Sequence, residues 1–156
     1  MTPEIHIKLD DLTDKAVKRL LETHLKNASE HSPEEAIFAL DIDALKVPEI
    51  SFWTAWQASE VLGCGALKIL DSQHAEIKSM HTLERSRGKG IASQLLSHIL
   101  EQAKFKNIKR ISLETGTAEA YIPAHRLYKK HGFKQCGAFA DYQESEHSLY
   151  MSKLLY

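Results

Sequence analysis

The residues with the clearest chemical potential stand at positions 87–92, which read Arg-Gly-Lys-Gly-Ile-Ala. Gly88 and Gly90 allow a sharp turn and a close approach to a ligand, because glycine has no Cβ. The amphipathic segment that follows has helical periodicity, and the first amides of a helix lack intrahelical partners where the helix dipole is positive. The pattern predicts a site for an anion such as a pyrophosphate. Basic side chains add positive charge around it: Arg85, Arg87 and Lys89.

Two nucleotide-binding loops fit this segment less well. A Walker loop requires Ser or Thr directly after its lysine, and here Gly90 follows Lys89. A dinucleotide fingerprint requires a third Gly or Ala where Ser93 stands. The glycines alone are equally compatible with a plain turn bearing solvated charges. The function of this loop therefore has to be inferred from the secondary-structure elements around it.

Hydrophobic periodicity predicts those elements. Alternating apolar residues and turn signals predict strands at 5–9, 51–57, 61–70, 75–83, 110–115, 133–140 and 148–155. Apolar residues at helical spacing predict helices over 12–25, 91–103 and 123–130. Another helix is predicted from the capping box Ser32-Pro33-Glu34-Glu35 to a point before Val47, and Thr13 is the expected N-cap of the first helix.

The order of these elements defines a fold class. A strand, a helix and a strand over 75–115 imply a parallel crossover inside a mixed sheet. The sequence thus predicts a mixed α/β (α+β) fold, in which a mostly antiparallel seven-stranded sheet is flanked by about four helices.

Length and charge limit the functions open to the chain. Its 156 residues suit a single domain over 1–156. With 20 Lys+Arg against 21 Asp+Glu, the net charge of -1 provides no bulk field for nucleic acid or anionic lipid. No apolar run approaches the roughly 20 residues of a membrane span, and the first residues do not resemble a signal peptide. We expect a cytoplasmic protein without nucleic-acid or membrane partners.

Cysteine and histidine spacings give no sign of a metal. Cys64 and Cys136 lack CxxC spacing, and the nine histidines include no pair at a recognised ligand spacing. We therefore expect no metal cofactor and reduced cysteines.

Residues 77–133 resemble the GNAT superfamily of acetyl-CoA-dependent N-acetyltransferases. The superfamily motif Arg/Gln-x-x-Gly-x-Gly/Ala is matched by Arg87, Gly90 and Ala92. A second motif, Ala-x-x-Leu-Tyr-x-x-x-Gly-Phe, is matched at 124–133. The predicted element order also agrees, and segments near both motifs are similar to a bacterial subgroup of small acetyltransferases. One position departs from the pattern: Tyr121 stands where many members carry a cofactor-contacting Asn.

The resemblance implies a fold, a co-substrate and a reaction. The fourth and fifth strands would splay apart at a β-bulge, and the pantetheine arm of acetyl-CoA would lie along the fourth strand. The reaction would be direct attack by an amine of a small molecule or peptide on the acetyl group. The implied cofactor contacts are Met80, His81, Thr82, Arg87, Gly88, Lys89, Gly90, Ile91 and Ala92.

Three residues are the candidates for proton transfer. Tyr128 matches the family position of the general acid, and a phenol stays protonated at neutral pH. Glu114 at the end of a predicted strand is the preferred general base, and His81 is the second choice. Each residue also has a non-catalytic interpretation: Tyr128 would be a core aromatic, Glu114 a partner of a nearby cation, and His81 an outward-facing strand residue.

Alternatives from other classes stay open at this point. The chain could be a non-catalytic acyl-CoA-binding regulatory module, or, more weakly, a nucleic-acid-binding domain that uses its local basic residues. The identity of the acceptor is not encoded in these motifs. A homodimer is the commonest assembly, and the sequence neither requires nor excludes it.

Overall fold

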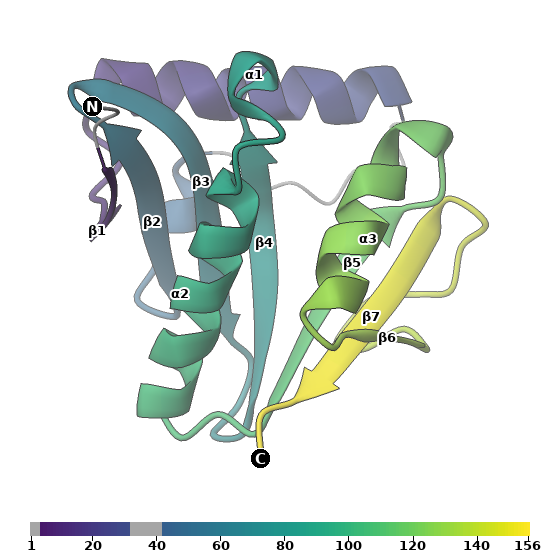
Figure 1. Ribbon diagram of the computed structural model, residues 1–156. Helices are drawn as coiled ribbons and strands as arrows, with labels where there is room; N and C mark the ends of the chain where they lie inside the picture. The colour runs from purple at the N-terminus through teal and green to yellow at the C-terminus, as the bar shows by residue number, and fades with distance from the viewer. Residues whose placement is uncertain (1–3, 32–41) are drawn as a thin grey trace.

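A single sheet of seven strands forms the centre of the molecule (Figure 1). The structure is a computed structural model that describes residues 4–31 and 42–156. The strand order is β1-β2-β3-β4-β5-β7-β6. The strands are β1 (Ile5–Leu9), β2 (Ile50–Gln57), β3 (Glu60–Ile69), β4 (His74–Thr82), β5 (Arg110–Gly116), β6 (Lys134–Cys136) and β7 (Ser148–Leu154).

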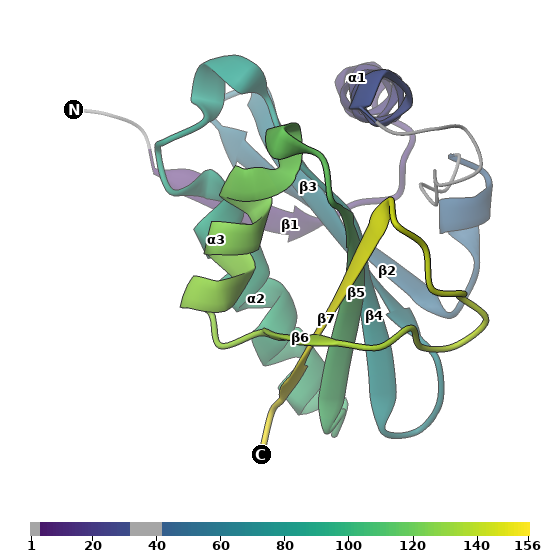
Figure 2. The ribbon, with the colours of Figure 1, turned by 90° about the vertical axis from the view of Figure 1, so that its right-hand side faces the viewer.

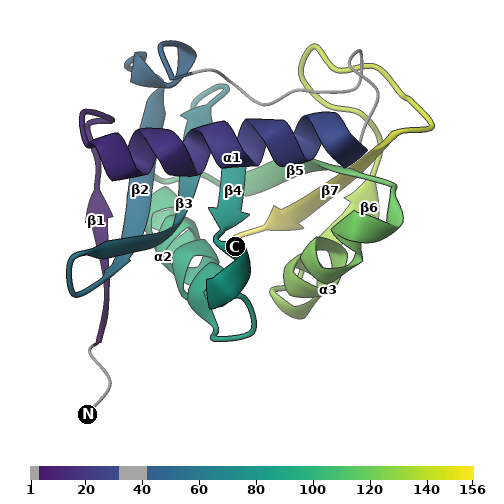
Figure 3. The ribbon, with the colours of Figure 1, turned by 90° about the horizontal axis from the view of Figure 1, so that it is seen from above.

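Helices cover the two faces of the sheet unequally. Helix α1 (Lys15–His31) crosses the strands on one face, whereas α2 (Ile91–Phe105) and α3 (Ile122–Lys130) lie on the other (Figures 2 and 3). Alternating strand residues therefore enter two cores. One core joins α1 to residues such as Phe52 and Ala66, and the larger one joins α2 and α3 to residues such as Ile77 and Leu113. Among the described residues, no helix combines the length and apolar character that a membrane span requires.

The pairing of β4 with β5 is parallel and short. It runs from His74↔Arg110 to Ile77↔Leu113, whereas every other strand pair is antiparallel. Beyond this point β5 continues to pair with β7 as far as Gly116, and β4 and β5 diverge (Figure 1). This divergence opens the sheet at its middle.

A β-bulge in β4 accompanies the divergence. The register against β3 shifts between Cys64↔His81 and Ala66↔Lys78, which leaves one extra residue in β4. Ser79 adopts a positive φ of 55° there, and the Cys64 Sγ donates a hydrogen bond of 3.2 Å to the Ser79 carbonyl oxygen. A bulge bends its strand and increases the local twist. It therefore supplies a physical reason for β4 to leave β5.

The predicted fold class is confirmed, with local corrections. The mostly antiparallel seven-stranded sheet and its parallel pair are present, and three α-helices flank it in the described part of the chain. The predicted helix from Ser32 to a point before Val47 falls mostly on 32–41, outside the described residues, and in its last part the structure has a short 3-10 helix, Ala44–Lys46. The N-cap of α1 is not Thr13 but Asp14, whose Oδ1 accepts a hydrogen bond of 2.7 Å from the Ala16 amide.

The predicted strand over 133–140 is too long. Strand β6 ends at Cys136, because the following backbone makes turn contacts instead of a ladder. The Ala138 amide donates to Glu144 Oε1 at 2.6 Å, and the Tyr142 amide donates to the Phe139 carbonyl oxygen at 3.0 Å. Residues 137–147 thereby form a long segment on the α1 side of β5 and β7 (Figure 2).

Close contact between α2 and β3 depends on two glycines. A Cβ added at Gly63 would lie 2.9 Å from the His81 carbonyl oxygen and 3.2 Å from Leu95 Cδ1. A Cβ at Gly65 would lie 2.8 Å from Ile99 Cδ1. The helix that follows the glycine loop is therefore seated directly on the sheet.

We expect Gly63→Ala to destabilise the protein by about 1–3 kcal/mol, because backbone rather than a flexible side chain blocks the new methyl group. Urea unfolding measures the effect. Gly137→Ala is the matched control, since its Cβ would meet only Glu144 Oε1 at 3.3 Å. Equal midpoints for the two variants would contradict the packing argument.

Candidate active site

The loop before α2 has the geometry that the glycine pattern predicts. Gly88 and Gly90 both adopt a φ of 80°, in the left-handed region that side chains disfavour. Gly90 is the N-cap of α2 and offers no side chain to its first amides. The first turn of a 15-residue helix therefore presents amide donors without a side-chain cap.

Two of the arginines in this region are held in place. The Arg87 Nε donates to the Thr82 carbonyl oxygen at 3.3 Å, which ties the glycine loop to the end of β4. The Arg85 guanidinium lies 3.3 Å from Glu60 Oε2 in an exposed pair, so part of its charge is directed away from the loop. Lys89 is exposed beside the two glycines.

The end of β4 carries the three residues expected beside the pantetheine arm. On the β3 side, His81 pairs with Cys64 and Thr82 pairs with Gly63. On the β5 side, the ladder has already ended at Ile77. In the part of the chain that the structure describes, this edge of β4 is therefore open to a ligand backbone. Met80 packs toward the α2 core, and His81 faces α1.

The ring of His81 lies against the ring of His24 from α1, with centroids 5.1 Å apart. Burial, the neighbouring His24 and the charge of Arg87 lower the pKa of His81 to about 4. Burial lowers the pKa of His24 to about 4 as well. Both imidazoles are thus neutral at neutral pH, and His81 is poorly suited to gain a proton during a reaction at that pH.

Three buried side-chain atoms lack a hydrogen-bond partner among the described residues: Ser79 Oγ, His81 Nε2 and Glu114 Oε2. All three belong to β4 or β5 beyond the last pair of their ladder. A buried polar atom without a partner costs about 1–3 kcal/mol and is uncommon in native structures. Their concentration at one point favours a site that a ligand completes. Ser79 was not among the predicted site residues: the family resemblance implies a bulge in this region, but the residue pattern does not mark the position at which it occurs.

Glu114 lies on the α1 side of the sheet, opposite to the buried Ile111 and Leu113. Burial raises its pKa to about 7, and the nearby Glu76 adds to the rise. The hydroxyls of Ser148 and Tyr150, and the charge of Lys78, act in the other direction. A carboxyl group with this pKa can accept a proton near neutral pH.

Tyr128 lies on the other side of the sheet, in the core formed with α2 and α3. Its side chain is 6% exposed, and its ring packs edge-on against Phe133 with centroids 5.7 Å apart. Burial raises the pKa of the hydroxyl, so the phenol stays protonated and can only donate. The structure thus places the two predicted catalytic residues on opposite faces of the sheet, on either side of the divergence of β4 and β5.

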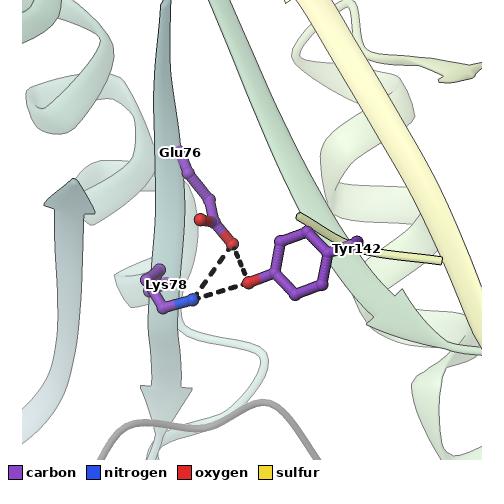
Figure 4. Close-up of polar contacts among 3 residues, drawn as sticks. All are labelled: Glu76, Lys78 and Tyr142. Carbon is purple, nitrogen blue, oxygen red and sulfur yellow. Dashed lines mark hydrogen bonds and ion pairs between the residues drawn. The ribbon is translucent and has the colours of Figure 1, made fainter. Parts of the chain in front are cut away.

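Sequence reasoning missed a buried polar cluster formed by Glu76, Lys78 and Tyr142 (Figure 4), and the charges of Glu76 and Lys78 act on Glu114. The Lys78 Nζ donates to Glu76 Oε2 at 3.1 Å and to the Tyr142 hydroxyl at 2.7 Å. The Tyr142 hydroxyl donates to the same Glu76 oxygen at 2.5 Å. In the sequence, Glu76 and Lys78 alternate with apolar residues and read as a solvated strand face. Tyr142, from residues 137–147, contacts both of them in the folded chain.

The departure from the family pattern at Tyr121 has a structural counterpart. The Tyr121 ring occupies the space that a side chain on Gly116 would need. The His125 Nε2 lies 2.7 Å from the Gly116 carbonyl oxygen. These contacts fix the start of α3, and hence Tyr128, to the end of β5.

Comparisons with known proteins agree with this geometry. Residues 15–133 match the acetyltransferase (GNAT) family. The uncharacterized N-acetyltransferase YsnE of Bacillus subtilis strain 168 is 48% identical over 97% of this chain and all of its own length. The uncharacterized N-acetyltransferase YedL of Escherichia coli K12 is 44% identical over 96% of this chain and 94% of its own.

A solved structure shares the fold at lower identity. A GNAT family acetyltransferase from Elizabethkingia anophelis with acetyl-CoA bound superposes with a TM-score of 0.71 at 21% identity. The match covers 96% of this chain and 97% of that chain. The chain belongs to the acetyltransferase (GNAT) family. It is an acyltransferase that uses an acyl-CoA co-substrate and acts on an amine.

We expect Gly90→Ala to weaken the binding of coenzyme A about tenfold, or about 1.4 kcal/mol. An alanine at positive φ is strained, and relief of that strain would move the first amides of α2. Isothermal titration calorimetry with coenzyme A measures the change. Gly132→Ala is the matched control, because Gly132 also has a positive φ, of 91°, and lies after α3. An unchanged affinity in Gly90→Ala would exclude the loop as the anion site.

The pKa of Glu114 also predicts how stability depends on pH. The folded value of about 7 exceeds the ordinary value of 4.5, so the folded chain holds this proton more tightly than the unfolded chain. The stabilisation is complete below pH 4.5 and is lost as the pH rises through about 7. Glu114→Gln should therefore be more stable than the wild type at pH 8 by about 1–2 kcal/mol, discounted for partial exposure. Urea midpoints at pH 4.5 and pH 8 test this, and an equal difference at both values would contradict it.

Proposed function

We propose that the chain transfers the acetyl group of acetyl-CoA to a primary amine of a small molecule or peptide by direct attack. The observation that carries this proposal is the divergence of β4 and β5 beside unpartnered buried polar atoms. The uncapped helix start lies on the α2 side, and a carboxyl group with a pKa near 7 lies on the α1 side. Two substrates could thus meet through the sheet.

The α2 side supplies the contacts for the co-substrate. The amides at the start of α2 and the guanidinium of Arg87 suit the pyrophosphate, which carries negative charge. The β5-facing edge of Met80–Thr82 suits the amide groups of the pantetheine arm, as an added strand would. The acetyl-CoA bound to the Elizabethkingia relative supports acetyl-CoA as the donor here.

The α1 side supplies the proton acceptor. Acetyl-CoA provides the acetyl group as an activated thioester. An ammonium has no lone pair, so Glu114 removes a proton from the acceptor nitrogen, directly or through a water. The nitrogen then forms the C–N bond as the C–S bond breaks. The Tyr128 hydroxyl, which its raised pKa keeps protonated, donates a proton to the departing sulfur. The product nitrogen releases its second proton to water to give the neutral amide, and the Tyr128 oxygen regains a proton from water.

A second candidate is an acyl-CoA-binding module without turnover. The burial of Tyr128 in the α2–α3 core favours it, because a core aromatic needs no catalytic role. This candidate requires the same co-substrate contacts and makes the Tyr128 hydroxyl dispensable.

An assay of thiol release from acetyl-CoA distinguishes the acetyltransferase from the binding module. The amines tested are polyamines, amino acids, aminoglycosides and short peptides. We expect turnover with one amine class and a loss of about a hundredfold or more in Tyr128→Phe and in Glu114→Gln. Tyr156→Phe is the matched control, because that hydroxyl is exposed and bonds the Lys104 carbonyl oxygen far from the loop. In the wild type, the acid limb of the pH profile should lie near pH 7.

Full activity in Tyr128→Phe would overturn the assignment of the general acid. Tight binding of acetyl-CoA without thiol release for every amine would favour the binding module.

A further inference from the structure

Burial of the cluster formed by Glu76, Lys78 and Tyr142 carries a desolvation cost in the free energy of folding. The side chains of Lys78 and Glu76 are only 7% and 4% exposed. A buried ion pair loses much of its hydration, and an apolar pair of similar volume is often as stable. The cluster therefore does not by itself indicate a stabilising role, and its position in the fold says more about what it does.

The cluster lies where the acceptor side of the proposed reaction begins. Lys78 is the last β4 residue before the bulge at Ser79, and Glu76 lies within the final pairs of the β4–β5 ladder. Tyr142 reaches them from residues 137–147, so the cluster joins the sheet to the segment that covers this face (Figure 4).

The charged and titratable groups that act on Glu114 come from three elements. Strand β4 provides Glu76 and Lys78, strand β7 provides Ser148 and Tyr150, and the covering segment provides Tyr142. Of these, Glu76 and Lys78 form a salt bridge with each other. Their charges act on Glu114 in opposite directions. Because they lie 3.1 Å apart, the two effects largely cancel.

We propose that Glu76, Lys78 and Tyr142 are positioning residues for the proton acceptor. Lys78 neutralises Glu76, and Tyr142 fixes both to the covering segment, so that Glu114 remains the one carboxyl group on this face that exchanges a proton during turnover. This inference rests on the proposed role of Glu114, although the interaction itself can be measured without an acceptor.

The two charges predict shifts of opposite sign. In Glu76→Gln, the charge of Lys78 acts unopposed, and the titration midpoint of Glu114 should fall by about one unit. In Lys78→Met, Glu76 and Glu114 become two carboxyl groups without a shared cation. Their upper midpoint should then rise by about one unit, because neighbouring carboxylates resist double ionisation.

The experiment follows the carboxyl carbon of Glu114 by NMR from pH 4 to pH 9, with Glu114→Gln to assign the signal. It uses the full chain and no acceptor, so a failure of the proposed function does not affect it. The expected result is a lower midpoint in Glu76→Gln, a higher one in Lys78→Met, and a value close to wild type in the double variant. Shifts of the same sign, or no shift in either variant, would overturn the proposal.

Two further measurements exclude a merely structural role. Tyr142→Phe changes no charge, so the midpoint should move less than half as far as in Glu76→Gln. Once an acceptor is found, its KM should rise in Tyr142→Phe, and the acid limb of kcat/KM should follow the NMR midpoints. If Glu76→Gln does not fold, the upward shift in Lys78→Met decides: its presence supports the proposal and its absence overturns it.

Discussion

The short ladder between β4 and β5 is the constraint on which the rest of the site depends. Four residue pairs hold the two halves of the sheet together, and the bulge at Ser79 then directs β4 away from β5. A continuous ladder would satisfy every backbone group and separate the two faces completely. Because the ladder ends early, a group held on the α2 face can reach a group held on the α1 face. Sheet architecture, rather than a surface depression, defines where chemistry can occur.

Burial also changes the ionisation of the side chains near the divergence of β4 and β5. Side chains that would be ordinary on a solvated strand become strongly coupled when residues 137–147 and α1 cover them. Glu114 gains a pKa near 7, and His81 loses its capacity to be charged at neutral pH. The same environment makes Glu76 and Lys78 dependent on each other. The ionisation of these side chains thus depends on segments distant in the chain as well as on the strands that carry them.

Sequence reasoning succeeded where local rules dominate. The glycine loop, the amphipathic α2 and the order of the strands along the chain follow from φ preferences and periodicity, and the structure confirms each. It failed at two element ends: Asp14 rather than Thr13 caps α1, and β6 ends at Cys136, after which the Ala138 amide donates to Glu144. The Glu76–Lys78–Tyr142 cluster also could not be predicted, because Glu76 and Tyr142 lie 66 positions apart in the sequence.

The glycines of β3 have a consequence for the kinetics of recognition. Because a Cβ at Gly63 or Gly65 would have no room, α2 packs directly on the sheet, and this packing positions its first amides before any ligand arrives. The first turn of α2 then loses its conformational entropy during folding instead of each time that a ligand binds. An anion would meet a rigid set of donors, and association should be close to a single step. Slower conformational adjustment would be confined to the opposite face, where the irregular segment 137–147 forms part of the cover beside α1.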